Sequence, residues 1–179
     1  MSSAPPAREP PPATVVWITG LPSSGKSKLA RGLRTALLER GLGCLVLDGD
    51  ELRSALVPAP GYSDEERRTF YETLGNLAAL LARQGLIVIV PATAHRRSFR
   101  EHARNVAPHF FEIWVDVPVE ECRRRDKKGL YASFRAGRLS GIPGEDAGYE
   151  APEHPDMIAT GGADTAAIQA VAARLSEPS

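Results

Sequence analysis

The stretch "WITGLPSSGKSKLA", from Trp17 to Ala30, constrains the fold of this chain more than any other segment. It contains a G-x-x-x-x-G-K-[ST] pattern, with the fixed positions at Gly20, Gly25, Lys26 and Ser27. Glycines at these positions let successive backbone amides turn inward onto a phosphate, and the N-terminus of a following helix adds its dipole. An apolar run precedes the pattern and an amphipathic run follows it, so the stretch predicts a strand, a phosphate loop and a helix.

The side chains of this loop have predicted roles toward ATP and Mg²⁺. Lys26 is expected to bridge the β- and γ-phosphates, and the Ser27 hydroxyl to hold magnesium. The alternative is that this segment is a glycine turn that joins a strand to a helix and binds no ligand. A turn of that kind does not require the adjacent Lys-Ser pair. The loop residues predicted to contact the nucleotide are Gly20, Ser23, Ser24, Gly25, Lys26, Ser27 and Lys28.

Short apolar runs alternate with helical stretches beyond the loop, which is typical of an α/β fold. The predicted strands are residues 14–19, 44–48, 86–90 and 110–117, with a weak edge strand in 156–160. The predicted helices are residues 26–40, 63–83, 118–125 and 163–175, the second of them opened by a capping box formed by Ser63 and Glu66. Near-continuous apolar strands indicate a parallel sheet of about five strands flanked by helices on both faces.

An acidic pair follows the second predicted strand in the segment "LDGDELR", at Asp48 and Asp50. Ligands of open α/β sheets bind at the carboxyl ends of the strands, so both carboxylates are expected to face the phosphate loop. One would help to hold magnesium while the other accepts a proton from the attacking hydroxyl, and the residues leave open which does which. Asp50, Lys26 and Asp48 are thus the predicted catalytic residues. Arg53 is placed to clamp an anionic group of the acceptor.

Two segments lack apolar periodicity. Residues 1–13 are rich in proline and are predicted to form a disordered tail. Residues 126–156 are rich in glycine, proline and charge, and a segment of this length is expected to act as a lid. The remaining chain, residues 14–179, is predicted to form one domain that includes this lid.

The overall composition excludes several classes of function. The chain has 22 basic and 22 acidic residues, so no global field favours nucleic acid. The sequence contains no run of 18 apolar residues, which a membrane-spanning helix would need. Its two cysteines, Cys44 and Cys122, lack the close spacing that a disulfide framework or a zinc site would show. We expect a cytoplasmic protein whose partner is a small molecule rather than a nucleic acid or a membrane.

Several segments, in order, resemble one family, the adenylyl-sulfate kinases, which phosphorylate the ribose 3′-hydroxyl of adenosine 5′-phosphosulfate. The matching segments are "GLPSSGKS", "LDGDELR", "GYSDEERR", "LLARQGLIVIV", "RDKKGLYASFRAG" and "YEAPEHP". The resemblance implies a P-loop kinase fold, MgATP as the donor, a closing lid and a homodimer. It also implies that Asp50 is the base, that Arg53 and Arg67 face the acceptor, and that lid residues Arg125 and Lys128 lie near the nucleotide.

Three places depart from the pattern of this family. The family usually has Phe-Ile-Ser-Pro-Tyr-Arg after the third strand. In this chain residues 92–97 occupy that place, and only Arg97 agrees with the family pattern. The second departure is in the helix after "SDEER", where the family's Asn-Ile-Arg-Arg is replaced by residues 70–73, starting with Phe70. The third is in the predicted lid, where the family's Asn-Phe-Thr-Gly is replaced by residues 141–144, which include Ile142. Phe70 either supplies a relocated apolar wall for the acceptor or packs within its helix. The predicted substrate-binding set is Asp50, Arg53, Arg67, Arg97, Phe70 and Ile142. The basic cluster at residues 95–97 either binds an anionic group of the acceptor or is in part a solvated helix start.

The departures remove stacking faces worth about 1–3 kcal/mol each and charge-assisted hydrogen bonds worth about 1.5–3 kcal/mol each. The residues therefore favour a kinase that has kept its ATP half and changed its acceptor to another anionic hydroxyl compound. An authentic adenylyl-sulfate kinase is the first alternative. A non-catalytic ATP-binding regulatory module is the second.

Overall fold

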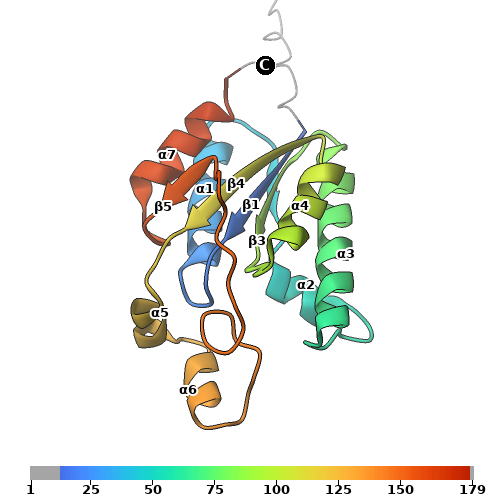
Figure 1. The fold of residues 1–179 in the computed structure, drawn as a ribbon. Helices are drawn as coiled ribbons and strands as arrows, with labels where there is room; N and C mark the ends of the chain where they lie inside the picture. The colour runs from blue at the N-terminus through green and yellow to red at the C-terminus, as the bar shows by residue number, and fades with distance from the viewer. Residues whose placement is uncertain (1–12, 178–179) are drawn as a thin grey trace, which may run out of the picture.

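A computed structural model of the chain describes residues 13–177, and its strands form one five-stranded sheet (Figure 1). The strands are β1 (Thr14–Thr19), β2 (Cys44–Val46), β3 (Ile87–Pro91), β4 (His109–Val115) and β5 (Met157–Ala159). Their order in the sheet is β2-β3-β1-β4-β5, and every neighbouring pair is parallel. The predicted α/β fold with a parallel sheet of about five strands is confirmed.

Helices cover both faces of this sheet (Figure 1). The helices are α1 (Lys26–Glu39), α2 (Gly49–Ala55), α3 (Asp64–Ala82), α4 (Arg97–Val106), α5 (Val119–Arg125), α6 (Leu130–Arg135) and α7 (Thr165–Arg174). One face carries α1 and α7, and the other carries α3 and α4. The short helices α2, α5 and α6 lie toward the end of the molecule at which the strands finish.

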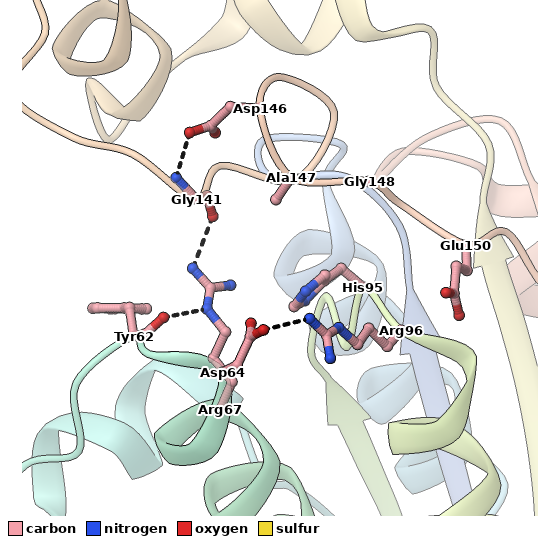
Figure 2. A pocket seen from close by; sticks show the side chains of 10 residues that line it. All are labelled: Tyr62, Asp64, Arg67, His95, Arg96, Gly141, Asp146, Ala147, Gly148 and Glu150. Carbon is pink, nitrogen blue, oxygen red and sulfur yellow. Dashed lines mark hydrogen bonds and ion pairs between the residues drawn. The ribbon is translucent and has the colours of Figure 1, made fainter.

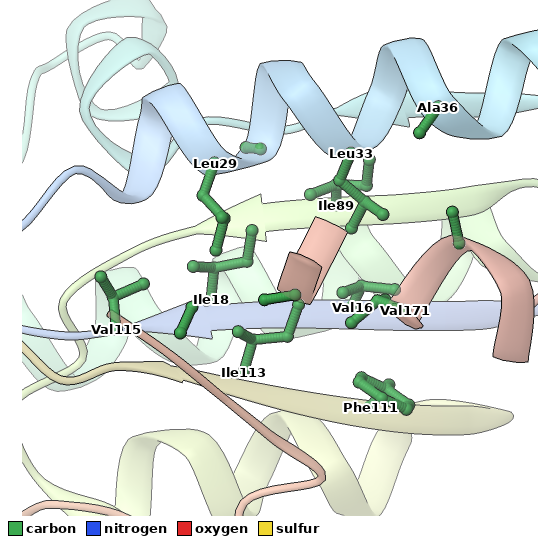
Figure 3. Close-up of a cluster of buried hydrophobic side chains, with 14 of the residues drawn as sticks. Val16, Ile18, Leu29, Leu33, Ala36, Ile89, Phe111, Ile113, Val115 and Val171 are labelled. Atoms are coloured by element: carbon green, nitrogen blue, oxygen red, sulfur yellow. The ribbon is translucent and has the colours of Figure 1, made fainter. Parts of the chain in front are cut away.

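The apolar core is divided by the sheet into two clusters. Side chains of β1 alternate between them, because successive residues of a strand point to opposite faces. Val16 and Ile18 pack against Leu29 and Leu33 of α1, as Figure 3 shows, whereas Trp17 packs in the cluster under α3 and α4. Burial on both faces explains why the strand runs are almost continuously apolar.

Local sequence signals set the starts of two helices that position the site. The Ser63 hydroxyl accepts a hydrogen bond from the Glu66 amide at 3.3 Å, and the Glu66 carboxylate accepts one from the Ser63 amide at 3.0 Å. This reciprocal pair is the predicted capping box of α3. At the start of α2, the Asp48 carboxylate accepts a hydrogen bond from the Asp50 amide at 2.9 Å.

The structure adds three helices that the periodicity did not predict, α2, α4 and α6, of which α4 is the longest. Helix α4 buries Phe99, Ala103 and also Arg100, which is 2% exposed. Arg100 is neutralised by the Glu112 carboxylate of β4 at 2.9 Å, so a charged residue occupies a core position. A count of apolar residues therefore misses the buried face of this helix.

The segment 126–156 contains α6 and a compact turn. The Asp146 carboxylate accepts hydrogen bonds from the amides of Gly141 and Ile142, both at 2.8 Å, which closes the turn. The function of this segment as a lid and the single domain over residues 14–179 stay predictions. Residues 1–12 of the predicted tail lie outside the described residues. Among residues 13–177, no helix is long and apolar enough to cross a membrane.

Candidate active site

The loop between β1 and α1 has the backbone that its glycines predict. Gly25 has φ of 107°, and a Cβ there would lie 2.6 Å from the Gly162 nitrogen. Gly20 has φ of 153°, and a Cβ there would lie 2.7 Å from the Val115 carbonyl oxygen. Any larger residue at either position would collide with backbone that cannot move away easily. The loop is therefore shaped by backbone proximity as well as by the two positive φ angles.

Lys26 and Ser24 present polar groups that suit a phosphate ligand. The Lys26 ammonium donates hydrogen bonds to the carbonyls of Gly20 and Leu21, at 3.0 and 2.7 Å, so it lies across the loop. Burial lowers the pKa of Lys26 to about 8, which means that an added anion would stabilise its charged form. The Ser24 hydroxyl is buried and has no partner among the described residues. The loop thus fits the triphosphate of a nucleotide.

The two aspartates of the acidic pair have different surroundings. Asp48 accepts a hydrogen bond from the Ser27 hydroxyl at 2.7 Å, in addition to the amide that it caps. The Ser27 hydroxyl oxygen and the Asp48 carboxylate oxygen therefore lie close together, and oxygen atoms of this kind are the ligands that Mg²⁺ prefers. The Asp50 side chain is 70% exposed and forms an ion pair with Lys128 of the 126–156 segment. The geometry separates a fixed carboxylate from an accessible one.

The remaining predicted nucleotide contacts lie around the same loop. Arg125, at the end of α5, donates a hydrogen bond to the Ser24 carbonyl at 3.3 Å and is held by Glu121 at 2.7 Å. Lys28 is exposed on the first turn of α1. Ser23 has φ of 63° and so contributes to the tight bend of the loop. Their contacts with a nucleotide stay predictions.

A cavity of about 380 Å³ lies next to the loop that follows the carboxyl end of β3 (Figure 2). Its walls come from three separate segments: the start of α3, the loop after β3, and the segment 141–150. Tyr62, which is 64% exposed, gives it an aromatic wall, and Arg67 and Arg96 give it positive charge. A volume of this size is suitable for a small molecule.

The cationic side chains of the cavity also hold its walls together. Arg67 donates hydrogen bonds to the carbonyls of Tyr62 and Gly141, both at 2.8 Å, which joins α3 to the 126–156 segment. Arg96 forms an ion pair with Asp64 at 2.7 Å. The cavity is therefore a mixed site, with guanidinium groups partly balanced by carboxylates.

Of the residues predicted to bind the acceptor, only Arg67 lines this cavity; Asp50, described above, and four others do not. Arg53 is buried, donates to the Gly61 carbonyl at 2.6 Å, and its guanidinium lies 3.8 Å from the centre of the Phe70 ring. Phe70 is 3% exposed and belongs to the core under α3, which agrees with the alternative that it packs within the protein rather than against the acceptor. Ile142 belongs to the core on the α1 side, and Arg97 pairs with Glu153 at 2.6 Å. Their roles toward a substrate stay predictions.

Two residues that line the cavity, Tyr62 and Glu150, were not predicted from the sequence to bind a ligand. His95 and Arg96 also line it; both belong to the basic cluster predicted at residues 95–97, although neither was placed in the substrate-binding set. Tyr62 directly precedes the capping box of α3, and Glu150 lies in the segment "YEAPE", so both were marked by neighbouring motifs. The arginine that faces the cavity is Arg96 rather than its neighbour Arg97. Arg96 is the N-cap of α4 and pairs with Asp64, whereas Arg97 is the first residue of the helix and pairs with Glu153.

The site has a strand, a glycine loop with an adjacent Lys-Ser pair, and an acidic pair after the next strand along the chain. These features are typical of P-loop kinases, in which the phosphate loop joins a parallel sheet to a helix. The family model for adenylylsulphate kinase matches residues 12–160. The chain therefore belongs to the adenylyl-sulfate kinase family, whose members are ATP-dependent phosphotransferases that act on a hydroxyl group. The predicted family and enzyme class are confirmed.

Three relatives illustrate this membership. The chain is 41% identical over 155 residues to the bifunctional enzyme CysN/CysC of Mycobacterium tuberculosis, covering 84% of this chain and 25% of that enzyme. It is 42% identical to the adenylyl-sulfate kinase of Pseudomonas aeruginosa, covering 80% of this chain and 74% of that one. The solved structure of M. tuberculosis APS kinase CysC in complex with AMPPNP and APS matches with a TM-score of 0.82 and 40% identity, covering 93% and 96% of the two chains. This chain thus spans only a quarter of the bifunctional enzyme.

Proposed function

We propose that this protein is an authentic adenylyl-sulfate kinase, which transfers the γ-phosphoryl group of MgATP to the ribose 3′-hydroxyl of adenosine 5′-phosphosulfate. The observation that carries the proposal is the cavity next to the loop after β3, where the exposed Tyr62 ring lies near the guanidinium group of Arg67. An aromatic face suits an adenine base, and guanidinium groups suit a phosphosulfate. The match over 93% of the chain to a kinase solved with AMPPNP and APS supports the same acceptor.

Each polar group near the phosphate loop has a role in this reaction. Lys26 would neutralise the negative charge of the transferring phosphoryl group, and Ser27 with Asp48 would hold Mg²⁺. The magnesium ion, when bound, shields charge on the phosphate oxygens. Asp50 would orient or deprotonate the acceptor hydroxyl, since it is accessible while Asp48 is occupied by two hydrogen bonds.

A different anionic hydroxyl compound is the second candidate acceptor. It is favoured by the position of Phe70, which is buried beside Arg53 and leaves no second aromatic among the cavity residues. The comparisons give no support to this change of acceptor, so we place it behind the phosphosulfate. In both cases the acceptor is small and anionic, and a homodimer and a cytoplasmic location stay proposals.

The direct test is release of ADP from MgATP in the presence of adenosine 5′-phosphosulfate, with the phosphorylated product identified by mass spectrometry. We expect saturable turnover at micromolar phosphosulfate. Asp50→Asn should reduce turnover by at least about 100-fold, as expected for loss of a general base. Glu51→Gln is the matched control, because Glu51 is the next, exposed carboxylate on the same helix.

Three other results would redirect the assignment. Turnover of another hydroxylated anion without turnover of the phosphosulfate would support the second candidate. Tight ATP binding without any acceptor-dependent ADP would indicate a regulatory module. Equal loss of activity in Asp50→Asn and Glu51→Gln would exclude a specific role for Asp50.

A further inference from the structure

His95 brings a buried polar atom without a partner to the wall of the acceptor cavity. Its side chain lines the cavity, the residue is 5% exposed, and Nδ1 has no hydrogen-bond partner among the described residues. Figure 2 shows the imidazole pointing toward the space between Arg67 and the 141–150 segment. Buried polar atoms in proteins nearly always have partners, so an unpartnered one at a cavity indicates a ligand group.

The charged side chains of the cavity already have partners within the protein. Arg67 donates to two carbonyls, and Arg96 is paired with Asp64. The Asp146 carboxylate closes the 141–147 turn, and the Glu150 carboxylate accepts a hydrogen bond from a backbone amide at 2.6 Å. Among the buried side-chain atoms described at the cavity, only the His95 nitrogen remains unsatisfied.

The imidazole is held in a fixed position by contacts on its other sides. Its ring meets the Phe99 ring edge-on, with 5.5 Å between the centroids. The His95 carbonyl accepts a hydrogen bond from the Glu150 amide at 2.8 Å, and Arg100 donates to the preceding Ala94 carbonyl at 2.6 Å. A group held in this way is preorganised to recognise a ligand.

The charges around His95 determine what kind of group it recognises. Arg67 and Arg96 face the ring from α3 and from the loop after β3, and Asp64 and Glu150 face it with negative charge. Burial, followed by the two guanidinium groups, lowers the pKa of His95 to about 4. The ring is therefore neutral near pH 7 and has a nitrogen that accepts a hydrogen bond, which the guanidinium groups cannot do.

We propose that His95 is a specificity-determining residue, whose Nδ1 accepts a hydrogen bond from an O–H or N–H group of the acceptor molecule. The guanidinium groups would then recognise the anionic part of the acceptor, and the imidazole a hydroxyl or amino group on its uncharged part. This inference deepens the proposed function and rests on the acceptor occupying this cavity.

The test compares His95→Phe, which keeps a ring without nitrogen, with His95→Asn, which keeps an acceptor close to the position of Nδ1. Each variant is assayed with adenosine 5′-phosphosulfate, AMP, glycerol 3-phosphate and gluconate, and His109→Asn at the exposed start of β4 is the control. We expect His95→Phe to lower kcat/KM for the best acceptor of the wild type by about 10- to 100-fold. The KM for ATP should stay within about twofold, and His95→Asn should recover most of the loss.

The outcomes separate this inference from the proposed function. If the wild type uses the phosphosulfate best and His95→Phe shows the expected loss, both are supported. If another member of the panel is used best and shows the same loss, the role of His95 stands and the proposed acceptor is wrong. If His95→Phe keeps kcat/KM within about twofold, or raises the KM for ATP equally, the inference is overturned. No turnover of any panel member would overturn both.

Discussion

The buried His95 should make the stability of this protein depend on pH in a way that one substitution removes. Burial and the nearby Arg67 and Arg96 lower its pKa from 6.5 to about 4 in the folded chain, while Asp64 and Glu150 only partly oppose this shift. The unfolded chain therefore binds a proton at higher pH than the folded chain does. The free energy of unfolding must fall as the pH decreases from about 6.5 toward 4.

The size of this effect follows from the two pKa values. With an unfolded value of 6.5 and a folded value of about 4, the linked loss is about 2 kcal/mol at pH 5 and about 3 kcal/mol at pH 4. The residue is 5% exposed, so solvent screening does not remove most of the effect. A loss of this size is a large share of the stability of an ordinary domain.

The assay is urea unfolding of the wild type and His95→Asn at pH 7.5 and pH 5.0. Other groups titrate similarly in both proteins, so their contributions cancel when the two pH-induced losses are subtracted. We expect the wild type to lose about 2 kcal/mol more than His95→Asn between these conditions. A difference below about 0.5 kcal/mol would show that the folded protein accepts the protonated imidazole, and the electrostatic reasoning would then be wrong.

Three further predictions concern the site and its supports. Gly25→Ala should weaken ATP binding by at least about tenfold and lower the free energy of unfolding by about 1–3 kcal/mol, because Gly25 has φ of 107° and a Cβ there would lie 2.6 Å from backbone. Calorimetry with ATP measures the first effect and urea unfolding the second. An unchanged affinity for ATP would refute the predicted role of the loop. Asp48→Ala and Asp50→Ala should both lose kinase activity, but only Asp48→Ala should lose about 1 kcal/mol of stability, because it removes the side chain that caps α2. Equal unfolding midpoints for the two variants would contradict this. Arg100→Met should lower the free energy of unfolding by about 3–5 kcal/mol, because it leaves the buried Glu112 carboxylate with only the partly exposed Arg104 as an ion-pair partner. A loss below about 1 kcal/mol in urea unfolding would show that the Arg100–Glu112 pair is dispensable.

Much of the architecture was accessible from local patterns. The strand predicted at residues 14–19 is β1, and the helices predicted at 26–40 and 63–83 are α1 and α3 to within a residue or two. These elements have strong apolar periodicity and clear starting signals, so tertiary contacts reinforce what the sequence already favours. Helix α4 was missed because its buried face includes Arg100, whose pairing partner lies on a strand.

The predicted acceptor residues show where local patterns are insufficient. Arg53, selected for its charge and position, is occupied by the Gly61 carbonyl and by the Phe70 ring. Arg97 was placed in the predicted substrate-binding set and Arg96 was not, yet it is Arg96 that lines the cavity. A charged residue can contact a ligand in this cavity only if the fold brings its side chain to the cavity wall, and that cannot be read from its neighbours in sequence.

The sequence by itself determined the phosphate loop, the five strands, the helices α1, α3, α5 and α7, and the acidic pair after β2. Each of these depends on residues close together in the chain, whose backbone preferences and spacing carry the information. Only the tertiary structure decided that Tyr62, His95 and Arg96 share one cavity with the turn that follows Gly141. It also decided that the His95 nitrogen is left without a partner. Both results depend on distant segments converging at the ends of parallel strands, and on which polar groups that convergence leaves unsatisfied.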